Sequence, residues 1–174
     1  SPRTEREYVR GEKSTRLPGY LDDDGISNMV ENLYRKIDFY DNTVNLVTVE
    51  FVSPLADFSP GIYQFYLRDT AMLGDTRCVH LYFTPRQKTD LAFNGDMWIA
   101  FDSSYALKKI QVEIPAQINL NWVNGLQIEQ EFAWMDIPGG RALLPTSDVV
   151  TMEFGVMKTE NSKTILAQKT SSYA

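Results

Sequence analysis

The chain has 174 residues, a formal net charge of -6, one cysteine and one histidine, and 43% of its residues are hydrophobic. This length suits one domain with its own core, while the two low counts exclude an internal disulfide and zinc sites built from several Cys and His. The acidic balance argues against nucleic acid and anionic membranes as partners, because both require a positive surface.

The first 25 residues are polar and are predicted to form a linker. Pro2 and Pro18 interrupt this stretch, which ends in the acidic run 22–25 (DDDG). The run lacks the alternating ligands and the final Glu of an EF-hand loop, so we interpret it as a solvated helix start and predict no metal site. The chain shows neither the apolar core of a signal peptide nor a run of about 18 apolar residues, and it is interpreted as an excised or processed piece of a longer protein.

One helix is predicted, over residues 27–37. Its apolar side chains recur every three or four residues on one side, at Ile26, Val30, Leu33, Tyr34 and Ile37. Asp24 or Ser27 is a suitable cap for its first turn.

From Thr43 onward the pattern changes to a period of two, which is typical of strands. Such alternation belongs in an antiparallel sheet that is covered on one side only. Since one helix cannot cover six or more strands, the sheet must curl on itself or pack against a second sheet. The predicted strands are 43–51, 62–70, 77–85, 93–101, 106–114, 126–134 and 149–157, with a short last strand at 165–169.

Two of these strands, 93–101 and 106–114, have a defined predicted register. A turn at 102–105 brings their apolar faces together and places a lysine over an indole on the wet side. Gly95 lies between large inward residues and predicts a bend or bulge. The predicted pairs are Phe101–Ala106, Ile99–Lys108, Met97–Ile110, Trp98–Lys109 and Asp96–Gln111.

Six phrases of the chain resemble a known family: 37–42 (IDFYDN), 51–55 (FVSPL), 66–70 (YLRDT), 83–86 (FTPR), 93–99 (FNGDMWI) and 118–132 (INLNWVNGLQIEQEF). In this order they resemble an uncharacterised domain family of large Bacteroidetes outer-membrane proteins. In those proteins a carboxypeptidase-regulatory-like domain comes first and a predicted outer-membrane β-barrel region follows. The family has no established activity, so the resemblance implies location: the periplasmic side of the outer membrane, with other domains of the same larger protein as partners.

A second resemblance concerns shape. A Thr-Pro exit at 84–85, a strand with Trp98-Ile99 and a strand with Lys108-Lys109-Ile110 resemble the central meander of LolA-like and LolB-like lipoprotein carriers. Their curved sheet holds an acyl chain against a helix. This likeness is an analogy of fold and implies a lipid or lipoprotein-like apolar ligand.

The predicted fold is therefore a single α+β domain over residues 26–170, with a tail at 171–174. Its strongly curved antiparallel sheet forms a half-barrel, and the helix packs on the concave side. A β-sandwich is the alternative.

No catalytic residue and no cofactor is predicted. Cys78 and His80 point to the same strand face about 7 Å apart, too far for a nucleophile and its base. Carboxylates on the wet strand faces are explained by solubility, and nothing places two of them at a catalytic separation: Asp96, Glu113, Glu129 and Glu131.

Apolar and aromatic side chains are the candidates for a ligand site or an interface. In a curled sheet they either fill the core or line a cavity. The predicted function is a non-enzymatic envelope domain that binds an apolar or lipid-like ligand in its concavity, with a scaffold that docks on neighbouring domains or on a barrel as the alternative. The candidates are Phe93, Met97, Trp98, Ile99, Ile110, Trp122, Ile128, Phe132 and Trp134.

Overall fold

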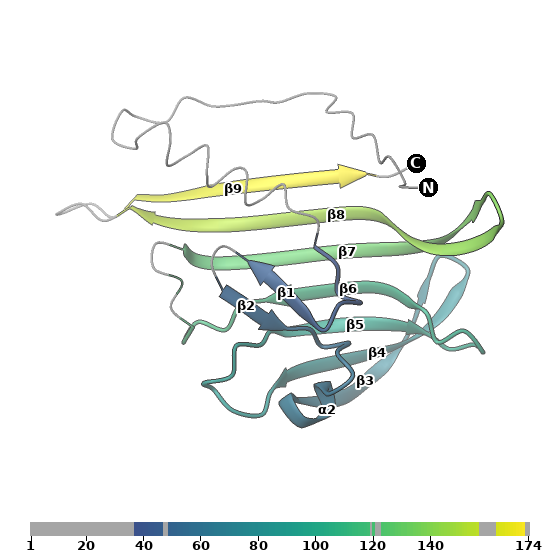
Figure 1. The fold of residues 1–174 in the computed structure, drawn as a ribbon, viewed down its shortest axis with the longest axis horizontal. Coiled ribbons are helices and arrows are strands. Elements are labelled where there is room, and N and C mark those ends of the chain that lie inside the picture. The colour runs from purple at the N-terminus through teal and green to yellow at the C-terminus, as the bar shows by residue number, and fades with distance from the viewer. Residues whose placement is uncertain (1–36, 47–48, 119, 121–122, 157–162, 173–174) are drawn as a thin grey trace.

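The computed structural model describes residues 37–46, 49–118, 120, 123–156 and 163–172, and these residues are nearly all β-sheet (Figure 1). Two strands, β1 (Thr43–Leu46) and β2 (Val49–Val52), pair with each other. Seven more form one antiparallel sheet in which each strand pairs with the next along the chain. They are β3 (Tyr63–Leu73), β4 (Thr76–Pro85), β5 (Asn94–Ala100), β6 (Leu107–Glu113), β7 (Val123–Ile137), β8 (Gly140–Val156) and β9 (Lys163–Ser172).

The α+β prediction is wrong. Within the described residues the one helix is α2 (Ser59–Ile62), a single turn. The predicted linker 1–25 and the predicted helix 27–37 lie outside the described residues, except for Ile37, which is buried and not helical. No helix in the described part of the chain has both the length and the apolar character needed to span a membrane.

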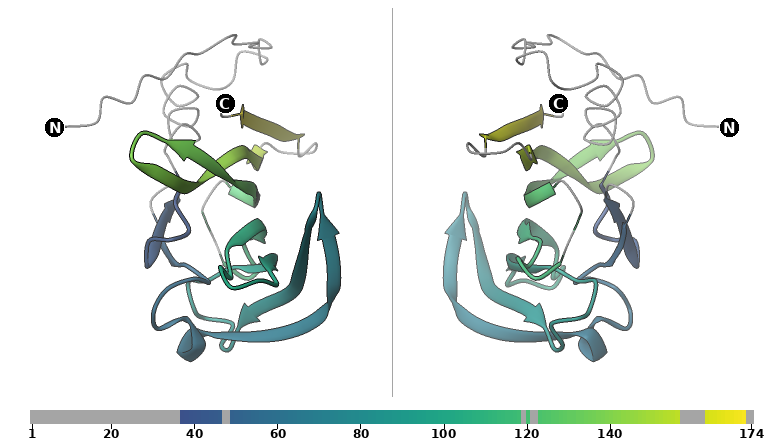
Figure 2. Two further views of the ribbon diagram at one scale, coloured as in Figure 1. Left: turned by 90° about the vertical axis from the view of Figure 1, so that its right-hand side faces the viewer. Right: turned by 90° about the vertical axis from the view of Figure 1, so that its left-hand side faces the viewer.

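The half-barrel prediction is also wrong. The sheet is open, with β3 and β9 at its edges, and the end-on views show twist without closure (Figure 2). The β-sandwich alternative fails as well, because the second sheet holds only β1 and β2. The expected reason for curling was that one helix cannot cover the apolar face; a hairpin and loops cover its central strands instead.

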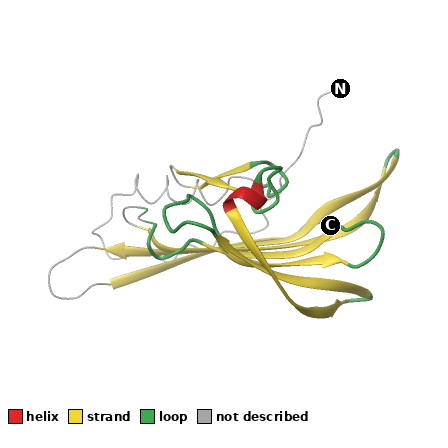
Figure 3. Ribbon diagram, turned by 90° about the horizontal axis from the view of Figure 1, so that it is seen from below, coloured by secondary structure: helices red, strands yellow, loops and turns green. Residues whose placement is uncertain are grey.

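This covering layer, the described residues of 37–62, lies on one side of the sheet (Figure 3), and we call it the cover. We call the sheet face beneath it the core face and the opposite one the open face. The expected strand 43–51 is in fact the β1–β2 pair of the cover. Val52 attaches the cover to the β4–β5 connection, because its amide donates to the carbonyl of Leu91 at 2.8 Å.

The strand predicted at 126–134 is confirmed as part of β7, and its side chains alternate between the two faces. Leu126, Ile128 and Phe132 are buried on the core face, while Gln127 is exposed. Gln130 is also buried, and its Nε2 donates to the carbonyl of Ile37 at 2.9 Å. The polar residue at a core position thus connects the cover to the sheet, since a buried amide needs a partner.

The β7–β8 hairpin is longer than predicted, because Pro145 does not end β8. Pro145 lies opposite Phe132, next to a register shift between Glu131 and Phe132. A proline has no N–H to donate, and a bulge is where a strand tolerates it. The hydroxyl of Thr146 donates to the carbonyl of Glu131 at 3.2 Å at the same point.

The predicted register of β5 and β6 is confirmed at three of its five pairs: Met97–Ile110, Trp98–Lys109 and Asp96–Gln111. The predicted Phe101–Ala106 pair is not formed, because the carbonyl of Ala106 accepts from the amide of Ala100 at 2.8 Å. Ile99 pairs with Leu107 instead of Lys108, because the register shifts after Trp98. The bulge predicted at Gly95 therefore lies further along β5. Gly95 has another role: a Cβ there would clash with the Gln111 carbonyl oxygen and lie 2.8 Å from the Phe83 ring.

Candidate functional site

The nine predicted ligand or interface residues do not form one site. Five are buried in the core: Phe93, Met97, Ile110, Ile128 and Phe132. Ile99 is half-buried and packs against that core, and Trp134 is exposed near the end of β7. Trp98 lies on the open face, paired with Lys109, and Trp122 lies outside the described residues.

Side chains of the cover occupy the space in front of the buried candidates. The ring of Phe93 stacks on Phe51 with centroids 4.9 Å apart and meets Phe39 edge-on at 5.9 Å. The hydroxyl of Tyr63 donates to the carbonyl of Val52 at 2.5 Å and accepts from the amide of Phe93 at 3.1 Å. Burial raises the pKa of Tyr63, so the phenol stays protonated and keeps its bond to the cover. These contacts make Phe93 a core residue rather than the wall of a cavity.

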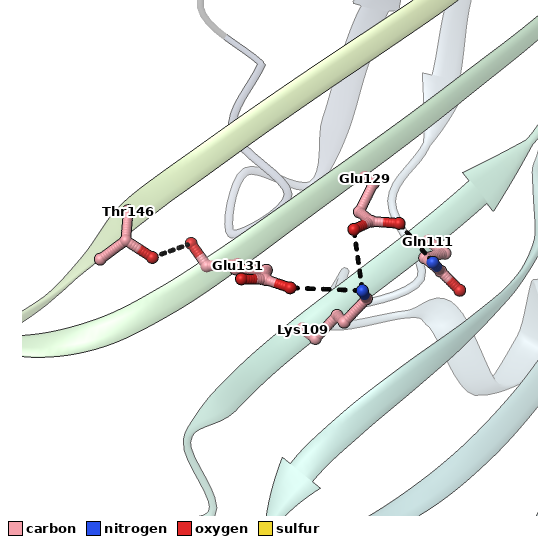
Figure 4. A network of polar contacts seen from close by, with 5 residues as sticks. All are labelled: Lys109, Gln111, Glu129, Glu131 and Thr146. Atoms are coloured by element: carbon pink, nitrogen blue, oxygen red, sulfur yellow. Dashed lines mark hydrogen bonds and ion pairs between the residues drawn. The ribbon is translucent and has the colours of Figure 1, made fainter. Parts of the chain in front are cut away.

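The open face carries a network of charged and polar side chains on β6 and β7 (Figure 4). The Nζ of Lys109 lies 2.8 Å from Glu129 and 3.3 Å from Glu131. Gln111 also donates to Glu129. These residues follow each other across the strands, since Lys109 pairs with Glu131 and Gln111 with Glu129.

Each member of the Lys109–Glu129 pair favours the charge of the other. Desolvation by burial opposes both charges, but the hydrogen bonds outweigh it. They raise the pKa of Lys109 through Glu129 and Glu131, and they lower the pKa of Glu129 through Lys109 and Gln111. Both groups are therefore ionised at neutral pH, and their charges are paired with each other.

A second cluster on the open face surrounds His80. Its two ring nitrogens lie 3.0 Å from Asp69 and 2.7 Å from Asp96, and its ring stacks on Trp98 at 4.5 Å. Lys109 lies over the same indole at 5.8 Å, as predicted from the register. The two clusters thus join into one row across β3 to β7.

The possible catalytic groups do not converge. The ring nitrogens of His80 face Asp69 and Asp96, while the Sγ of Cys78 lies 3.6 Å from the carbonyl of Thr76. Burial raises the pKa of the Cys78 thiol, which disfavours a nucleophilic thiolate. Among the described residues no group of three or more His, Cys, Asp or Glu is arranged to hold a metal ion.

The surface shows a different kind of candidate where the core face extends past the cover. On β3, Phe65 and Leu67 lie opposite Phe83 and Leu81 and so share the core face, but they are 37% and 70% exposed. Phe65 continues the aromatic core, with its ring 6.3 Å from that of Phe83. We call Phe65 and Leu67 the β3 flank.

A further exposed group lies at the end of the sheet that carries the β3–β4, β5–β6 and β7–β8 connections. We call this group the hairpin end: Met72, Arg77, Phe101, Tyr105, Trp134 and Arg141. Of these residues, Trp134 alone is among the nine candidates predicted from the sequence. The other residues of the hairpin end could have been found from their positions next to turn residues, because large apolar side chains there extend beyond the core.

These features define an all-β domain built on one open antiparallel sheet with a small cover. The chain belongs to DUF5686, a family of unknown function, whose sequence model matches residues 17–172. This confirms the predicted relation to an uncharacterised domain family. No curated protein and no solved structure matches the chain.

Proposed function

We propose that this domain is a non-enzymatic docking module of a larger cell-envelope protein, and that a neighbouring domain of the same protein covers the β3 flank. The periplasmic location and the carboxypeptidase-regulatory-like neighbour follow from the family resemblance and are part of the proposal. So is the Bacteroidetes origin.

The observation that carries the proposal is that the core face is wider than its cover. Phe83 is fully buried, yet its cross-strand neighbour Phe65 and the next residue on that face, Leu67, are exposed. An apolar surface continuous with a core is typical of a contact with another domain.

The geometry of β3 favours side-chain contact over the addition of a long strand. The register with β4 is regular from Tyr63 to Leu67 and then shifts before Asp69, which leaves Arg68 as an extra residue. A bulge with charged side chains is a device that protects a sheet edge from pairing. A docking domain therefore contacts the side chains of the β3 flank, and the contact surface ends at Arg68.

The alternative, an apolar ligand in a cavity, is less well supported. Phe93 contacts Phe39 and Phe51 of the cover, and Phe132 contacts Tyr40. Both candidates are buried, and the sheet face beneath the cover is packed.

The test is a photo-crosslinking amino acid at position 67 of the full-length protein. We expect crosslinks to a different domain of the same polypeptide after irradiation and mass spectrometry. The same amino acid at position 91, another exposed leucine outside the flank, is the matched control and should give few such crosslinks. Equal yields at both positions, or crosslinks to other proteins alone, would contradict the proposal.

A further inference from the structure

The hairpin end combines exposed apolar side chains from three separate connections of the sheet. Met72 in β3, Phe101 after β5 and Tyr105 before β6 are 61%, 60% and 72% exposed, and Trp134 in β7 is 39% exposed. All three connections lie at the right-hand side of Figure 1. Isolated exposed hydrophobic residues are ordinary, but several at one end of a domain mark an interaction surface.

Two arginines of the hairpin end lie on aromatic rings instead of carboxylates. The guanidinium of Arg77 is 5.6 Å from the centroid of Phe101, and that of Arg141 is 6.0 Å from the centroid of Trp134. Within the described residues neither has an ion-pair partner, whereas Arg68 lies 3.9 Å from Asp96. A guanidinium stacked on a ring keeps its N–H groups available for an oxyanion such as phosphate.

The backbone at Tyr105 supports a role for its exposed ring. Its φ of 48° lies in the left-handed region, which aromatic residues rarely adopt. Such strained backbone positions cluster at functional sites.

The β3–β4 and β5–β6 connections lie together, because the amide of Phe101 donates to the carbonyl of Arg77 at 2.8 Å, while the β7–β8 connection lies apart from them when the sheet is seen end-on (Figure 2). Because all three connections lie at one end of the sheet (Figure 1), an extended flat surface can touch them together. From these observations we propose that the hairpin end rests on a lipid bilayer, with the aromatic rings in the interfacial layer and Arg77 and Arg141 at lipid phosphates.

The charge of this end fits a bilayer better than the charge of the whole chain does. Residues 72–77, 101–108 and 134–141 contain three cations (Arg77, Lys108, Arg141) and three carboxylates (Asp75, Asp102, Asp136), a net charge of zero against -6 for the chain. A neutral end with exposed aromatic rings suits zwitterionic lipids, which carry no net charge.

The test is flotation of the chain with phosphatidylcholine vesicles. We expect the unmodified chain to float, and the double variant Phe101→Ser/Trp134→Ser to bind at least about tenfold more weakly, because each substitution removes exposed apolar surface. Arg77→Gln/Arg141→Gln should weaken binding about threefold to tenfold. Thermal unfolding of each variant shows whether the fold is kept.

The matched control is Phe58→Ser/Leu91→Ser, which removes two side chains of similar exposure at the other end of β3 and β4. It should float like the unmodified chain, and so should Leu67→Asp in the β3 flank, since this proposal does not depend on the docking function. Failure of the unmodified chain to float would overturn the proposal, as would equal loss of binding in the control and in Phe101→Ser/Trp134→Ser.

Discussion

The two faces of the seven-stranded sheet come from the same alternating strands but are held in different ways. On the core face, Met97 and Ile110 pair across β5 and β6 and are buried under the cover. One residue along, Trp98 and Lys109 pair on the open face, where contact is made by ring stacking and ion pairs. Within the described residues the open face has no second layer of chain, so its long side chains shield the sheet themselves.

This difference teaches where the stability of the domain resides. Packing on the core face depends on shape, and each methylene group lost there lowers the free energy of unfolding by about 1 kcal/mol. Ion pairs at a surface contribute little, because water screens them and long side chains lose entropy when ordered. Substitutions on the two faces should therefore differ in effect by several-fold.

The largest effect is expected for Gly95→Ala in β5. The added Cβ would clash with the carbonyl oxygen of Gln111 and approach the Cα of Val112 to 3.1 Å, and neither backbone atom can move without disturbing the β5–β6 pairing. We expect a loss of about 4 kcal/mol or more in the free energy of unfolding, measured by urea denaturation.

Gly125→Ala in β7 is the matched control. Its Cβ would meet the side chain of Glu153 at an ordinary 3.4 Å, so the substitution should change stability by less than about 1 kcal/mol. Similar losses at both glycines would show that the close approach of β5 and β6 at Gly95 is not what excludes a side chain.

A smaller effect is expected for Tyr63→Phe between the cover and the sheet. The substitution removes the hydroxyl that bridges the carbonyl of Val52 and the amide of Phe93, while the ring packing on Phe83 remains. Two buried backbone groups lose a partner, which costs about 1–3 kcal/mol. Hydrogen exchange should show faster exchange at the amide of Phe93, and unchanged exchange there would contradict the role given to the hydroxyl.

The sequence was sufficient for those parts of the fold that depend on local pattern. Alternation predicted most strands, and the turn at 102–105 was enough to fix Met97 opposite Ile110. The cover was not predictable in this way. The run 43–51 has the same β-branched pattern whether it forms one strand or two, and only contacts distant in sequence, such as Phe51 with Phe93, decide between them.

The candidate site shows the same limit. Exposure of Phe65 and Leu67 depends on how far the cover reaches across the sheet, which no spacing in β3 encodes. The arginine–aromatic pairs of the hairpin end join residues from different hairpins, Arg77 with Phe101, or from opposite strands of one hairpin, Arg141 with Trp134. By contrast Lys109 over Trp98 was predictable, because the register of a single short connection determines it.

The smallest effect is expected for Lys109→Met on the open face, which removes the ion pairs with Glu129 and Glu131 and keeps the packing of the side-chain stem on Trp98. At neutral pH the loss should be below about 1 kcal/mol. Because the folded state lowers the pKa of Glu129, the pair stabilises the domain above the ordinary glutamate pKa and this contribution disappears as the pH falls through the lowered value. Because the pKa of Lys109 is raised, its contribution is complete below the ordinary lysine pKa and is lost as the pH rises through the raised value.

The difference in stability between the unmodified chain and Lys109→Met should therefore be widest at intermediate pH and should shrink toward both extremes, when urea unfolding is followed from acid to alkaline pH. Lys108→Met is the control, because Lys108 forms no ion pair with another residue that the structure describes. Its difference from the unmodified chain should show no such maximum. A loss of several kilocalories with Lys109→Met would mean that the open face is held by its charges as firmly as the core face is by packing, and the contrast between the two faces would fail.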